Sequence, residues 1–212
     1  MAGIFYLNGL SPEPHRHHAF EDRALSEFNE LDIATRHAEM DYRSPAMLSD
    51  TINALAHEAS AFADEHGEVA VVGHSAGGSM VVHMAHRLTE RVNIQYYSIA
   101  GRLRVGEYGP LHPRGMVAAA HMGIYALGGH EYFTFSDAVR SLDRNVIPAL
   151  TDEVKDRITI LKPRLDQVVP RNLMDIEGVK TVVLPAFTHN RAAVHGLGYI
   201  LYEMRDRTSV DA

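Results

Sequence analysis

Short apolar runs alternate with longer amphipathic stretches along most of the chain. Runs of this kind, ending in turn-forming residues, are typical of buried strands in a parallel sheet; they cover residues 4–7, 31–38 (a weaker run), 68–72, 92–100, 157–161 and 180–184. Apolar residues spaced three or four apart predict helices over residues 11–28, 44–66, 77–87 and 136–145, and a terminal helix after His189. The alternation predicts an α/β fold with right-handed crossovers and about six parallel strands.

One apolar run leads directly into a glycine-flanked serine, within Gly73-His74-Ser75-Ala76-Gly77. The spacing is that of G-x-S-x-G, in which a serine leaves a strand and enters a helix within one residue. A sharp turn of this kind strains the serine and leaves no room for a Cβ at either glycine. The same spacing also fits a tight strand–helix turn without catalytic function.

With a strand before it and a helix after it, this motif resembles the nucleophile elbow of the α/β-hydrolase superfamily. The resemblance implies a serine hydrolase with Ser75 as nucleophile. Asp166 and His189 follow the last two predicted strands, and the order Ser75, Asp166, His189 matches the superfamily's nucleophile, acid and histidine. Asp166-Gln167-Val168-Val169-Pro170 is similar to the family's acid loop, with one additional valine before the proline.

Other residues compete for each role. His195 is near His189 but falls inside the terminal helix, and Asp143 and Asp175 are alternative acids. Asp166 could also be an aspartate that only supports a turn. We expect His189 and Asp166 to complete the catalytic triad, because they alone follow strand ends in the family's order.

The family resemblance also suggests an oxyanion hole. The loop after the first strand contains Asn8-Gly9, and by resemblance the backbone amide of Leu10 would pair with that of Ala76. Asn8 stands where the family usually has histidine, and a plain Asn-Gly turn is the alternative.

The segment 101–148 breaks the strand–helix alternation with several glycines and prolines. By resemblance it is a small helical cap inserted into a single domain, 1–212. Candidate pocket residues are Asn8, His74, Tyr108, Met116 and Tyr125, although aromatic and methionine residues in a cap can equally pack it onto the core. Two strands with which most family members begin are absent before residue 4, so one sheet edge could be covered by a second copy in a homodimer.

Composition limits the function further. The chain has 212 residues, 46% of them hydrophobic, a net charge of −7 and no cysteine. This balance argues against nucleic acid as a partner, and the lack of cysteine excludes disulfides and thiol catalysis. We find no signal peptide and no apolar stretch long enough to span a membrane, and expect a cytoplasmic protein.

The chemistry implied by the resemblance needs no metal and no organic cofactor. A group of histidines, His15, His17 and His18, does not share one helix face, and we interpret it as a solvated cluster. The first hypothesis is hydrolysis of a small-molecule carboxylic ester through an acyl-enzyme. The alternatives are an acyl thioesterase or acyltransferase, for which Arg102, Arg104 and Arg114 could bind an anionic carrier, and a non-catalytic binding protein on the same fold.

Overall fold

The computed structural model describes residues 2–9, 19–38, 40, 48–106 and 133–210. These residues form one six-stranded sheet in which every pair of neighbouring strands is parallel, in the order β2-β1-β3-β4-β5-β6. The strands are β1 Ala2–Leu7, β2 Ala34–Ala38, β3 Glu68–His74, β4 Ile94–Ile99, β5 Ile158–Pro163 and β6 Lys180–Leu184. The expected α/β architecture with about six parallel strands is therefore confirmed.

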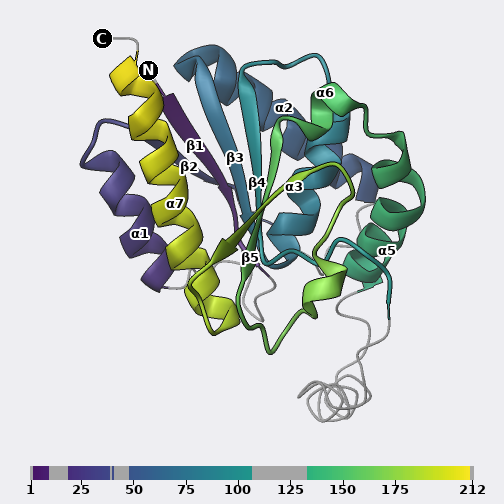
Figure 1. The fold of residues 1–212 in the computed structure, drawn as a ribbon. Helices are drawn as coiled ribbons and strands as arrows, with labels where there is room; N and C mark the ends of the chain where they lie inside the picture. Colours follow the sequence, from purple (N-terminus) through teal and green to yellow (C-terminus); the bar gives the residue numbers. More distant parts are fainter. Residues whose placement is uncertain (1, 10–18, 39, 41–47, 107–132, 211–212) are drawn as a thin grey trace.

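Helices cover both faces of the sheet (Figure 1). Successive residues of a strand point to opposite faces, so each of the inner strands β1, β3, β4 and β5 contributes to two cores. Phe5 and Leu7 of β1 pack with the helices on one face, and Ile4 and Tyr6 pack with those on the other. The first face carries α2 (Leu48–His66), α3 (Ala76–Arg87) and α5 (Phe133–Ser141), and the second carries α1 (Ala19–Asn29) and α7 (His189–Val210).

The boundaries of several elements differ from the sequence-based ones. β3 continues two residues beyond the predicted end, through His74, and α5 is followed directly by a π-helical turn, η1 (Leu142–Val146). Three short elements were not predicted: η2 (Ile147–Ala149), α6 (Asp152–Lys155) and η3 (Arg171–Leu173). Residues 10–18 and 107–132, which include the predicted start of the first helix and most of the predicted cap, lie outside the described residues.

The carboxyl ends of β1, β3, β4, β5 and β6 lie on the same edge of the sheet because all the strands are parallel. The residues that follow these strands therefore come together, although they are distant in the sequence. No helix in the described part of the chain is both long and apolar enough to cross a membrane.

Candidate active site

Ser75 occupies the sharp turn between β3 and α3. Its backbone has φ 57° and ψ −118°, a region that non-glycine residues rarely adopt. Every residue from 69 to 85 is buried except Ser75, which is half-buried. The hydroxyl makes no hydrogen bond that caps the helix that it precedes.

The two glycines of the motif are required by the backbone that surrounds them. A Cβ built on Gly73 would lie 2.2 Å from the carbonyl oxygen of Gly77, and one built on Gly77 would lie 2.4 Å from that of Leu7. These contacts are with backbone atoms, which cannot move aside as a flexible side chain can. The expected exclusion of a Cβ at both positions is confirmed.

The loop after β1 passes beside Ser75. A Cβ built on Gly9 would lie 3.0 Å from the Cβ of Ser75 and 3.5 Å from its Oγ. Asn8 is buried at the end of the strand. The backbone after β1 therefore passes close to the side chain of Ser75, while Leu10 lies outside the described residues.

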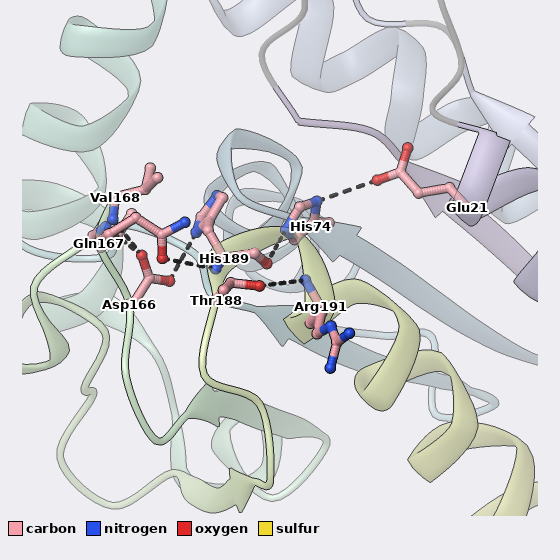
Figure 2. Close-up of polar contacts among 9 residues, drawn as sticks. Glu21, His74, Asp166, Gln167, Val168, Thr188, His189 and Arg191 are labelled. Carbon is pink, nitrogen blue, oxygen red and sulfur yellow. Dashed lines mark hydrogen bonds and ion pairs between the residues drawn. The ribbon is translucent and has the colours of Figure 1, made fainter. Parts of the chain in front are cut away.

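His189 and Asp166 form a close pair (Figure 2). Nδ1 of His189 lies 2.7 Å from Oδ2 of Asp166, and both side chains are buried. The carboxylate can only accept here, so Nδ1 carries a proton, and in the neutral form of the ring the lone pair lies on Nε2. Nε2 is the atom that a general base would use.

The loop after β5 fixes the orientation of this carboxylate. Oδ1 of Asp166 accepts hydrogen bonds from the backbone amides of Val168 (2.6 Å) and Val169 (2.8 Å). The side-chain oxygen of Gln167 accepts one from the amide of His189 at 3.2 Å. The additional valine of the acid loop is thus accommodated, since both valine amides turn toward the same oxygen.

The alternative residues are placed differently. His195 lies within α7, as predicted, and is exposed. Asp143 pairs with Arg104 at 2.9 Å, and Asp175 pairs with Lys162. Among these candidates, only Asp166 and His189 are joined to each other.

Sequence reasoning did not identify Glu21, which lies fully buried near this pair. Oε1 of Glu21 accepts a hydrogen bond from the hydroxyl of Tyr6 at 2.7 Å and lies 3.2 Å from Nδ1 of His74. Nε2 of His74 lies 3.1 Å from the carbonyl oxygen of His189. The sequence did hold a signal, since Glu21 shares a helix stripe with the buried Leu25 and Phe28 at spacings of four and seven.

The candidate pocket residues divide into two groups. Asn8 and His74 are buried, and His74 uses both ring nitrogens within the protein. Ala76, the expected second oxyanion donor, is the buried first residue of α3. Tyr108, Met116 and Tyr125 lie outside the described residues.

The start of the predicted cap is tied to the π-helical turn. Asp143 of η1 accepts hydrogen bonds from the guanidinium of Arg104 and from the amide of Val105. Burial alone would raise the pKa of Asp143, but these hydrogen bonds and the Arg104 charge outweigh it and hold the pKa below its ordinary value. Residues 104 and 105, just before the segment 107–132, are therefore tied to the turn that follows α5.

Among the described residues, no group of three histidine, aspartate or glutamate side chains could hold a metal ion. The histidine cluster at 15, 17 and 18 lies outside the described part of the chain.

No protein-family model matches the chain, and no curated protein sequence matches it. Solved structures do. A carboxylesterase structure from the thaumarchaeon Nitrososphaera gargenis matches 99% of this chain and 92% of its own, with a TM-score of 0.66 and 10% identity. The pyrethroid hydrolase PytH matches 98% of this chain and 97% of its own, with a TM-score of 0.59 and 14% identity.

A third match is a structure from Xanthomonas campestris described as a hydrolase of the alpha/beta superfamily. It covers 95% of this chain and 98% of its own, with a TM-score of 0.53 and 15% identity. Matches of this extent at such low identity establish the fold and not the substrate. The chain has the α/β-hydrolase fold.

Proposed function

We propose that this chain is a serine hydrolase that cleaves a carboxylic ester of a small molecule through an acyl-enzyme. The observation that carries the proposal is the contact of 2.7 Å between His189 and Asp166, because His189 also contacts His74, the residue before the strained Ser75. Neighbouring folds that are named as carboxylesterases and hydrolases support the same class of reaction.

The geometry suggests a role for each residue. Nε2 of His189 takes the proton of the Ser75 hydroxyl as its oxygen attacks the ester carbonyl. Asp166 holds the ring by Nδ1 and offsets the positive charge that the ring gains in the transition state. His189 then gives the proton to the departing alcohol, which leaves an acyl group on Ser75. A water molecule next gives a proton to His189 and attacks the acyl group. His189 returns this proton to the oxygen of Ser75 as the acid leaves.

The negative charge on the carbonyl oxygen needs hydrogen-bond donors. The amide of Ala76, at the N-terminus of α3, is the first candidate, and the amide of Leu10 in the loop after β1 is the second. We propose that these two amides form the oxyanion hole, and no metal or organic cofactor enters any step.

The test is a panel of nitrophenyl esters with acyl chains of graded length, assayed with the Ser75→Ala variant as the blank. We expect hydrolysis to fall by at least ~10³-fold in this variant, because the nucleophile is lost. The matched control is Ser79→Ala, which removes a hydroxyl four residues away that donates to the carbonyl of Arg102. Ester hydrolysis that persists in Ser75→Ala would rule out the proposal.

Acyl-CoA thioesters with the same acyl groups and a serine-directed phosphonate, used beside the ester panel, distinguish the alternatives. A thioesterase or acyltransferase acting on an acyl carrier would need basic groups to bind an anionic carrier, and the guanidinium of Arg104 is already paired with Asp143. Acyl-CoA thioesters are therefore expected to be turned over more slowly than esters of the same acyl group. A non-catalytic binding protein would form no covalent adduct at Ser75 with a serine-directed phosphonate.

A further inference from the structure

Glu21 is a carboxylate placed in the interior of the protein, away from the Asp166 that holds the ring of His189. It comes from the first turn of α1 and has no exposed surface. Burying an ionisable pair is a poor way to gain stability, because desolvation offsets most of the attraction between the charges. Its placement against a residue of the elbow therefore calls for a different explanation.

The two ring nitrogens of His74 contact different groups, and each contact requires a proton between its two atoms. Its Nε2 faces a carbonyl oxygen, which can only accept, so Nε2 must donate. Its Nδ1 faces Oε1 of Glu21, and one proton must lie between these two atoms for the contact to be favourable. The Glu21–His74 pair is therefore neutral as a whole and points one fixed donor at His189.

His74 touches His189 in two ways. Nε2 holds the backbone carbonyl of His189 at 3.1 Å, and the two rings pack with centroids 4.8 Å apart and planes tilted by 38°. Figure 2 shows His189 with Asp166 on one side and His74 on the other, and Glu21 beyond His74. The base is thus held by its Nδ1 from the β5 loop and by its backbone and ring face from β3.

We propose that Glu21 and His74 are positioning residues, which set the place of His189 through its carbonyl group and its ring face. The inference rests on the proposed function, since it takes His189 as the general base. Ser75 directly follows His74, so the residue that holds the base is covalently joined to the nucleophile. A shift of the His74 ring would change the distance between the two reacting groups, on which rate depends steeply.

The test compares two double variants in which no buried carboxylate loses its partner. Glu21→Gln with His74→Gln keeps an amide that can donate to the His189 carbonyl, whereas Glu21→Gln with His74→Phe keeps a ring but has no donor. We expect kcat to fall roughly tenfold more in the phenylalanine variant, with KM little changed, because the loss affects the placement of the base and not substrate binding. The rate of phosphonate labelling at Ser75 should fall in parallel.

The control for a general loss of stability is Tyr97→Phe, which removes a hydrogen bond of 3.1 Å between β4 and Glu203 near the other end of α7. We expect this variant to lower the melting temperature without changing kcat. If the two double variants lose stability but keep the wild-type kcat and labelling rate per folded molecule, Glu21 and His74 only support the fold and the inference is overturned.

A measurement without turnover separates this inference from the proposed function. In a Ser75→Ala background, the proton on Nδ1 of His189 should give a downfield NMR signal that Asp166→Asn removes. We expect the signal to broaden or vanish with His74→Phe and to persist with His74→Gln, both paired with Glu21→Gln. An unchanged signal in both would contradict the positioning role, whether or not Ser75 proves to be a nucleophile.

Discussion

Gly77 faces the carbonyl group of Leu7 so closely that a Cβ at this position would lie 2.4 Å from its oxygen and 2.7 Å from that of Asn8. We predict that Gly77→Ala lowers the free energy of unfolding by about 3 kcal/mol or more, because two backbone groups would have to move. It should also reduce hydrolysis strongly, since the displaced backbone supports Ser75. Urea unfolding and ester assays measure both effects.

The chain offers a matched glycine as the control. Gly198 lies within α7, and a Cβ there would meet no atom within 4 Å. Gly198→Ala should therefore stabilise the protein by about 0.5–1 kcal/mol, because alanine loses less backbone freedom in a helix. A Gly77→Ala protein as stable as this control would contradict the account of the elbow.

Replacing Asp166 by asparagine tests the pair that carries the proposed function. The new side-chain amide has the size of the carboxylate, but its NH₂ group can donate to Nδ1 of His189. The ring proton would then lie on Nε2, which could no longer act as the base. We expect kcat to fall by about 10³–10⁴-fold with little change in KM. Steady-state kinetics with the best nitrophenyl ester of the panel provide the measurement.

Asp143→Asn is the matched control for this substitution, because it also neutralises a partly buried aspartate, one that pairs with Arg104. It should lower stability modestly and leave kcat largely intact. Equal losses of kcat in the two variants would show that Asp166 does not hold His189 in the orientation that catalysis needs.

His83 should make the protein less stable as the pH falls. Burial lowers the pKa of His83 below its ordinary value, and the nearby His86 lowers it further, while the hydrogen bond of 2.9 Å to the carbonyl of Ala138 raises it in part. The folded pKa is depressed, so the neutral ring contributes stability above pH ~6.5, and that stability is lost as the pH falls through the folded pKa.

His83→Gln should remove this dependence, since its amide can still donate to the carbonyl but does not titrate. We expect the variant to lose less stability than the wild type between pH ~7.5 and ~5. His195→Gln, at an exposed histidine of α7, is the control and should lose as much as the wild type. Urea unfolding at the two pH values measures the difference, and identical losses in all three proteins would exclude His83 as the cause.

The inner strands β1, β3, β4 and β5 could be predicted well because they are short, apolar and buried on both faces. The last strand was predicted at the bounds that it has, Lys180–Leu184. The elbow strand was predicted to stop before Gly73 and His74, yet it continues through both. A polar ring ends an apolar run in the sequence, but in the structure its two nitrogens are satisfied inside the core.

The order of the proposed triad could be predicted from motifs at strand ends, but its supporting residues could not. Glu21 contacts His74 across a sequence separation of 53 residues, and no local pattern indicates which distant side chain a buried carboxylate will meet. The π-helical turn after α5 is a similar case, since Asp143 turns there to meet Arg104. Both features depend on tertiary contacts that periodicity does not record.

The base of the proposed triad is the first residue of α7, and this helix packs against α1, which lies near the other end of the chain (Figure 1). A ribosome makes Glu21, His74 and Ser75 long before it makes His189, and α/β domains gain their last helix only when it has left the exit tunnel. The strained serine therefore exists for a time without its base. Docking of α7 would bring the base to Asp166 and His74, which are already in place, so a nascent chain would remain inert until its fold is closed.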